Sequence, residues 1–118
     1  MKLSRQRRMR DWSEFHSVRT GGQSKAGRFL VIGTCEDPSL SDRKFGFITS
    51  KKASKKAITR NLLRRRFREI VRKWGDHLQE KHRIVTIARY KAAEASFQEL
   101  EADWISTAKR LKIWREDT

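Results

Sequence analysis

Hydrophobic positions recur along the chain with two different spacings, and these spacings predict its strands and helices. Short apolar runs rich in β-forming residues predict strands over 28–35, 44–50 and 83–90. Apolar residues three and four positions apart instead predict helices over 57–74 and 96–114. A chain of 118 residues is long enough for one hydrophobic core, so we expect a single domain over 1–118.

The N-terminal part predicts a short helix that begins at Asp11. Asp11 and Glu14 stand three positions apart, the spacing of a capping box in which each side chain binds a first-turn amide. The helix should end at Gly21, and 22–27 reads as a flexible connection. A further short strand, if one is present, falls at 17–20. One face of the helix is aromatic, with Trp12, Phe15 and His16 at positions i, i+3 and i+4.

The lengths of the connections predict how the strands pair. The link between 28–35 and 44–50 is short, which favours an antiparallel pair, whereas 83–90 follows 44–50 through a helix, which favours a parallel pair. The predicted fold is therefore α+β, a single-domain α/β sandwich in which a mixed four-stranded sheet packs with about three helices. General chain geometry would make the helical crossover right-handed, as in ~98% of cases.

The predicted helix 57–74 has two distinct faces. An apolar stripe indicates the side that meets the core, formed by Leu63, Phe67, Ile70 and Trp74 with Val71 beside it. A second face about 120° away gathers Arg60, Asn61, Arg64, Arg65, Arg68 and Arg72. Like charges four residues apart repel, and ordinary solvated faces mix both signs. Because a guanidinium matches phosphate oxygens in a planar fork, this face predicts a bound polyanion, and nucleic acid fits best.

Overall charge supports the same partner class. The chain has 29 Lys and Arg against 14 Asp and Glu, a net charge of +15. Residues 1–10 read as a basic arm that docks on phosphates. No apolar run approaches a membrane span or a signal peptide, so we expect a cytoplasmic protein with no membrane partner. The single cysteine excludes a disulfide framework and a thiolate zinc cluster. No motif of a catalytic or metal-binding site is present.

The sequence resembles the bacterial ribonuclease P protein subunit over nearly its whole length. The resemblance is carried by Lys44-Phe45-Gly46, Ser50-Lys51-Lys52, Lys56-Ala57-Ile58-Thr59-Arg60-Asn61, Arg64-Arg65, Arg68-Glu69 and Ile87-Ala88-Arg89. The order of elements around these motifs also fits the family. One departure is Leu62, which stands where the family usually has an arginine.

The resemblance implies a function and a set of partners. The protein would bind a large catalytic RNA, and the ribonucleoprotein would remove the 5′ leader from precursor transfer RNA. Mg²⁺ held by the partner RNA would perform the chemistry, so this chain would supply neither a metal ligand nor a catalytic side chain. The resemblance also implies a left-handed crossover around helix 57–74, against the general preference, and a cleft between the first helix and the sheet for the single-stranded leader.

Carried over residue by residue, the resemblance implies two groups of site residues. Contacts to the catalytic RNA would come from Lys51, Lys52, Lys56, Arg60, Asn61, Arg64, Arg65, Arg68 and Arg72. Contacts to the leader would come from Trp12, His16, Phe29, Val31 and Arg89. Phe29 and Val31 are two apart in the sequence and would share one strand face as the cleft floor. For Trp12, a place in the core is an equal alternative, and His16 stands where a second aromatic is common.

Two other classes of protein fit the basic helix. One is a ribosomal-type or architectural RNA-binding protein with no enzyme attached. The other is a DNA-binding module with helix 55–74 in a major groove. Arginines spread over about five turns exceed what one recognition helix needs, so no DNA partner is expected. The type of partner RNA and the oligomeric state are left open by the sequence.

Overall fold

The computed structural model describes residues 5–9 and 12–115, and for Arg5 and Trp12 it describes the backbone only. The capping partner predicted at Asp11 lies outside these residues, as does half of the predicted basic arm, residues 1–4 and 10. The α-helices are α1 (Trp12–Gly21), α2 (Ala57–Trp74) and α3 (Phe97–Arg110), and the strands are β1 (Gln23–Ala26), β2 (Leu30–Glu36), β3 (Lys44–Ile48) and β4 (His82–Ala88). Short 3₁₀ helices are η1 (Arg5–Arg7), η2 (Gly75–His77) and η3 (Tyr90–Glu94).

The four strands form one mixed sheet in the order β1-β2-β4-β3. β2 is antiparallel to both β1 and β4, and β3 is parallel to β4. The predicted parallel pair is therefore confirmed, but the predicted pairing of 28–35 with 44–50 is wrong because β4 lies between these segments. A short connection permits a direct pair without requiring one. β4 has buried residues on both faces, which suits it to the centre of the sheet.

The fourth strand lies in a segment where no strand was predicted. β1 occupies most of the expected flexible connection 22–27, whereas 17–20 belongs to α1. All four β1 residues are exposed, so no alternation of apolar residues marks the strand in the sequence. Gly22 makes the turn into β1 possible, because a Cβ atom there would collide with the backbone carbonyl groups of Thr34 and Val18.

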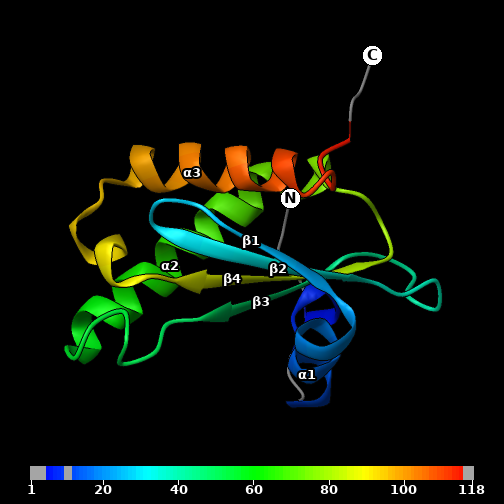
Figure 1. The fold of residues 1–118 in the computed structure, drawn as a ribbon, viewed down its shortest axis with the longest axis horizontal. Helices are drawn as coiled ribbons and strands as arrows, with labels where there is room; N and C mark the ends of the chain where they lie inside the picture. The colour runs from blue at the N-terminus through cyan, green and yellow to red at the C-terminus, as the bar shows by residue number, and fades with distance from the viewer. Residues whose placement is uncertain (1–4, 10–11, 116–118) are drawn as a thin grey trace.

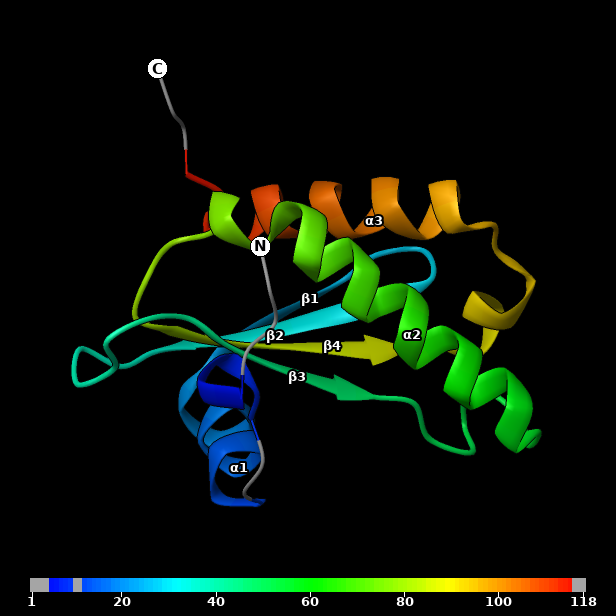
Figure 2. The ribbon, with the colours of Figure 1, turned by 180° about the vertical axis from the view of Figure 1, so that it is seen from behind.

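Helices cover the two faces of the sheet unequally. Figure 1 shows α3 on one side of the sheet and α1 on the other, and Figure 2 shows α2 crossing the same side as α3. In Figure 2, β3 and β4 point the same way, and α2 passes in front of them. When the picture is turned so that both strands point upward, β4 lies on the left of β3. The β3-α2-β4 crossover is therefore left-handed, as the family resemblance implies.

The main core lies between the sheet and helices α2 and α3. The predicted stripe of α2 is confirmed, because Leu63, Phe67, Ile70 and Val71 are buried and Trp74 is half-buried. On α3, the fully buried Trp104 donates from Nε1 to Thr86 Oγ1 of β4 over 3.0 Å. This hydrogen bond satisfies both polar groups inside an otherwise apolar layer.

The last helix begins as predicted but ends earlier. Ser96 accepts a hydrogen bond from the Glu99 amide, and the Glu99 carboxylate accepts one from the Ser96 amide, which completes a capping box. The helix ends at Arg110 instead of continuing to 114, because Lys112 has a φ of 62°, in the left-handed region. The chain then turns back, and Trp114 forms an isolated antiparallel bridge with Leu78.

Two glycines let α1 lie directly on the sheet. A Cβ atom at Gly46 of β3 would approach the Phe15 ring to 2.6 Å, and one at Gly33 of β2 would meet Val18 at 3.1 Å. Gly46 therefore marks a close approach of α1 to the sheet, a role that glycine often has inside a strand. Around this contact, Met9, Val18 and Val85 form a second and smaller apolar cluster.

Candidate RNA interface

Most of the basic face of α2 is exposed, and two of its arginines also bond to the preceding loop. Arg60 Nη1 donates to the carbonyl oxygens of Ser54 and Lys55 over 3.0 and 2.9 Å, and Arg64 Nη2 donates to Thr49 Oγ1 over 3.0 Å. Each guanidinium has five N–H donors, so both retain donors for a ligand. These bonds fix the direction of the two side chains and join loop 49–56 to α2.

The rest of the predicted face has little internal compensation for its charge. Arg68 is half-buried, and its Nε has no hydrogen-bond partner within the described part of the chain. Arg72 pairs with Glu69 at the margin of the face, over 2.8 Å. Lys73 reaches Glu101 of α3 at 3.2 Å, and its ammonium also lies over the ring of Trp74.

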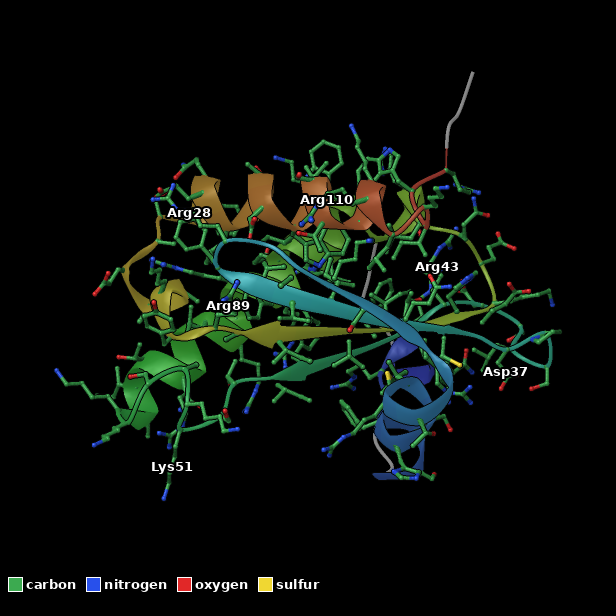
Figure 3. All side chains as sticks on the ribbon, viewed as in Figure 1. Arg28, Asp37, Arg43, Lys51, Arg89 and Arg110 are labelled. Carbon is green, nitrogen blue, oxygen red and sulfur yellow. The ribbon has the colours of Figure 1, made fainter. Side chains whose placement is uncertain are left out.

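The loop before α2 extends this basic surface. Lys51, Lys52 and Lys56 are exposed, and Figure 3 shows Lys51 pointing away from the body of the protein. Lys56 is the N-cap residue of α2 but supplies no side-chain hydrogen bond, and the first turn of the helix holds no acid. The partial positive charge of the helix N-terminus therefore adds to that of the lysines, which favours an anionic partner.

The remaining predicted RNA contacts on α2 are exposed as well, and they have apolar neighbours. Asn61 and Arg65 are exposed. Leu62, which replaces the usual family arginine, is 37% exposed, and Ile58 one turn earlier is 83% exposed. The substitution therefore places an accessible apolar side chain beside the basic face without interrupting the line of Arg60, Arg64 and Arg68.

The α1 side of the sheet carries a row of partly exposed apolar residues. Val31, Ile87 and Ile48 are in register across β2, β4 and β3, so their side chains lie side by side on one face. All three are half-buried. We call these three residues the cleft floor. Sequence reasoning had named Val31 for this role but not Ile48 or Ile87, because the strand register identifies them.

The other predicted leader contacts are placed differently. Phe29 is only 7% exposed and belongs to the α2/α3 core, so the prediction that it shares a face with Val31 is wrong. The chain turns before β2 begins at Leu30, and strand alternation therefore does not extend back to Phe29. His16 and Arg89 are exposed, whereas the side chain of Trp12 lies outside the described structure.

Ion pairs hold α1 against the sheet. Glu14 of α1 is 8% exposed, and its carboxylate lies 2.7 Å from Lys44 Nζ and 3.7 Å from Arg83 Nε. Arg83 also binds Asp37 at 2.7 Å. Hydrogen bonds from Ser39, and next from Arg83, lower the pKa of the Asp37 carboxyl group to about 2. These charges connect the first helix, the β2–β3 connection and the central strand.

One arginine of the N-terminal segment is used within the fold. Arg7 Nε lies 2.6 Å from Asp42, and its Nη1 lies 3.0 Å from Asp76. These carboxylates raise the pKa of Arg7, although burial opposes them. Of the predicted basic arm, Arg7 is therefore engaged with acids of this chain, whereas Arg8 is exposed.

Residues 5–9 and 12–115 hold neither a cluster of metal ligands nor a membrane-spanning helix. No three His, Cys, Asp or Glu side chains there lie together as ligands for a metal ion. Within the same residues, no helix is both long and apolar enough to cross a membrane.

Fold and site together define a small basic RNA-binding protein built on a mixed sheet with a left-handed crossover. The chain belongs to the ribonuclease P protein family, whose model matches residues 3–112. It is 37% identical to the ribonuclease P protein component of Syntrophomonas wolfei over 95% of this chain and 92% of that protein. It is 32% identical to the corresponding protein of a Picosynechococcus strain, over 98% and 96%.

Solved structures give the same result. The Staphylococcus aureus RNase P protein matches with a TM-score of 0.84 and 25% identity, over 92% of this chain and 98% of that one. The Thermotoga maritima RNase P protein matches with a TM-score of 0.76 and 26% identity, over 87% and 96%. The protein is thus part of an endoribonuclease ribonucleoprotein that acts in 5′ leader processing of transfer RNA. The comparisons give no support to the ribosomal-type alternative.

Proposed function

We propose that this protein binds the catalytic RNA of ribonuclease P through the basic face of α2 and loop 49–56, and the precursor leader over the cleft floor. The observation that carries the proposal is the separation of these surfaces. The basic helix covers the sheet face opposite α1, whereas Val31, Ile48 and Ile87 lie on the α1 face. One protein can therefore contact two RNAs at once.

The α2 surface suits a folded RNA with closely spaced phosphates. Arg60 and Arg64 are held in position by loop 49–56, so little side-chain entropy is lost when they bind. Contact with phosphate would also relieve the repulsion among arginines one turn apart. Asn61 and the exposed lysines of the loop extend the same surface.

The cleft floor suits a single strand of RNA. Bases of an unpaired leader offer apolar faces, and proteins commonly hold such strands by stacking bases on aromatic and apolar side chains beside basic groups. Val31 and Ile87 provide the apolar surface, and Arg89 at the end of β4 provides a cation. Trp12 and His16, on α1, are the proposed stacking residues at its border.

We assign the chemistry to Mg²⁺ held by the partner RNA, because the sequence offers no catalytic constellation of its own. The purified protein should leave precursor transfer RNA intact, and cleavage should appear when the cognate RNA and Mg²⁺ are added. Nuclease activity that survives exhaustive removal of RNA would contradict this assignment. The proposal places the ribonucleoprotein in the cytoplasm and gives the protein no DNA partner.

The α2 assignment is tested by the salt dependence of binding to the catalytic RNA. If Arg60, Arg64, Arg65 and Arg68 neutralise ~4 phosphates, log affinity should fall against log salt with a slope of roughly −3. Arg64→Ala with Arg68→Ala should flatten the slope by about 1.5, for two lost phosphate contacts. Lys109→Ala, an exposed cation on α3, is the matched control and should leave the slope unchanged. An unchanged slope in the double variant would move the RNA surface elsewhere.

The cleft assignment is tested with Trp12→Ala. Because base stacking contributes ~1–3 kcal/mol, the variant should bind leader-bearing precursor roughly tenfold more weakly in the assembled enzyme. Its affinity for mature transfer RNA should barely change. Equal losses for both ligands, or a collapsed melting temperature, would show that Trp12 is a core residue.

A further inference from the structure

The turn between β1 and β2 is held from α3 by a single carboxylate. Asp103 accepts hydrogen bonds from the backbone amides of Arg28 and Phe29 over 2.9 and 2.8 Å. The amide of Gly27 donates to the Leu30 carbonyl oxygen over 2.7 Å, which closes the turn. A Cβ atom at Gly27 would lie 2.5 Å from both Asp103 oxygens, so this contact requires glycine.

Two arginines hold the same turn by its carbonyl oxygens. Arg110 Nη2, from α3, donates to Ala26 over 2.9 Å, and Arg89 Nη1, from the end of β4, donates to Gly27 over 2.6 Å. Arg28, in the turn itself, places its guanidinium 5.0 Å from the centre of the Phe29 ring. Figure 3 shows these three arginines on the half of the sheet that leads to the β1–β2 turn. We call Arg28, Arg89 and Arg110 the hairpin-tip collar.

The three arginines of the collar retain N–H donors and positive charge that can bind an anion. All three arginines are exposed, and within residues 5–9 and 12–115 none of them forms an ion pair. Arg89 and Arg110 use only some of their five N–H donors on the turn and on Thr107, so both retain donors for a ligand. The nearby carboxylate of Asp103 is engaged by the two turn amides, and that of Glu99 is engaged in the capping box of α3.

The collar borders the edge strand β1, where the cleft floor on the α1 face ends and α3 approaches from the other face. Strand register places Ala26 beside Val31, so one row runs from Ile48 through Ile87 and Val31 to Ala26, and Arg110 binds the carbonyl oxygen of Ala26. The row crosses three strand spacings, or about 14 Å. A strand of RNA that follows it passes beyond β1 at this point.

We propose that the hairpin-tip collar binds backbone phosphates of the precursor leader where the leader runs past the cleft floor. This proposal rests on the cleft assignment above and adds Arg28 and Arg110, which give α3 a part in substrate binding. Hydrogen bonds to the turn hold Arg89 and Arg110 in direction before the ligand arrives, which reduces the entropy lost on binding. A guanidinium also matches a phosphate with two parallel hydrogen bonds.

The test compares precursors whose leaders are lengthened one nucleotide at a time, bound to the assembled holoenzyme. Arg28→Gln and Arg110→Gln are combined, because glutamine removes the charge but can still donate to the Ala26 carbonyl oxygen. With leaders long enough to pass the cleft, the double variant should bind about tenfold more weakly at about 0.1 M salt, and its salt slope should be about 1.4 smaller, for two single-strand phosphate contacts. With the shortest leaders it should match the wild type.

Lys109→Gln removes a neighbouring α3 charge and should behave as wild type at every leader length. A loss that is the same at all lengths would overturn the proposal, as would an equal loss of affinity for the catalytic RNA alone. A loss of affinity that grows with leader length supports binding by the collar. It does so even if Trp12→Ala weakens binding of precursor and mature transfer RNA equally, because that second result would overturn only the assignment of the cleft floor. Melting temperatures of all variants should agree, because the turn keeps its bonds to Asp103.

Discussion

The two faces of the sheet are stabilised in different ways. On the α2/α3 face, large side chains such as Phe45, Phe67 and Trp104 are 0–1% exposed. On the α1 face, a small apolar cluster is supplemented by the charges of Glu14, Lys44 and Arg83, and the row of Val31, Ile87 and Ile48 is left half open. Because the first face supplies most of the hydrophobic stabilisation, the second can leave apolar surface accessible to a ligand.

The largest effect should come from the closed face. Phe67→Ala removes a fully buried ring from the main core and should lower the free energy of unfolding by ~3–5 kcal/mol. Chemical denaturation measures the loss. If Phe67→Ala lowered the free energy of unfolding only as much as a substitution of an exposed residue does, the two faces would not differ in the way described.

Breaking the charge cluster on the α1 face should have a smaller effect. Glu14→Gln removes the counter-charge of Lys44 and leaves Arg83 with Asp37 as its remaining partner, and we expect a loss of about 2 kcal/mol. Hydrogen exchange should locate the change, with α1 amides losing protection before those of α2. Equal loss of protection in both helices would mean that the faces unfold as one unit.

A change at the contact between α1 and the sheet should affect the α1 face alone and so separates the two faces of the sheet. Gly46→Ala places a methyl group against the Phe15 ring, and the overpacking should cost about 1.5 kcal/mol. Binding of leader-bearing precursor should weaken as α1 shifts, while affinity for the catalytic RNA should not change. Gly21→Ala is the control, since a Cβ atom there meets nothing within 4 Å.

The smallest effect concerns pH. The pKa of Asp37 is lowered to about 2, so its stabilising contribution is complete above its ordinary value of 3.8 and is lost as pH falls through about 2. Asp37→Asn should remove this contribution, and its melting temperature should therefore fall less than that of the wild type between about pH 5 and pH 2. Parallel curves for the two proteins would show that the hydrogen bonds to Asp37 from Ser39 and Arg83 contribute nothing to stability.

The sequence predicted best the elements that are defined by their own periodicity. Helix 57–74 has the predicted bounds, because its apolar stripe and its basic face both repeat at helical spacing. β1 could not be predicted, since all its residues are exposed and only pairing with β2 makes it a strand. The position of β4 between β2 and β3 is likewise a property of the whole sheet rather than of any local pattern.

The candidate sites also divide into one that a local sequence pattern predicts and others that only the folded structure brings together. The arginines of α2 were found because they share a helical face, whereas the cleft floor needed the strand register to identify Ile48 and Ile87. The hairpin-tip collar joins residues far apart in the chain, such as Arg110 and Ala26, and no local pattern indicates such contacts. Phe29 was misplaced because strand alternation was extended across a turn.

The central place of β4 also governs the order in which the protein can fold during synthesis. Along the chain, β4 is the last strand of the sheet, yet it pairs with both β2 and β3. Of the strand pairings in the sheet, only the one between β1 and β2 can therefore form before residue 82 has been made. Pairings that close long loops form slowly, and α2 therefore leaves the ribosome with its apolar stripe uncovered. During that interval the sheet that will cover the apolar stripe of α2 has not yet formed. The basic face of α2 is nevertheless already accessible to nearby RNA.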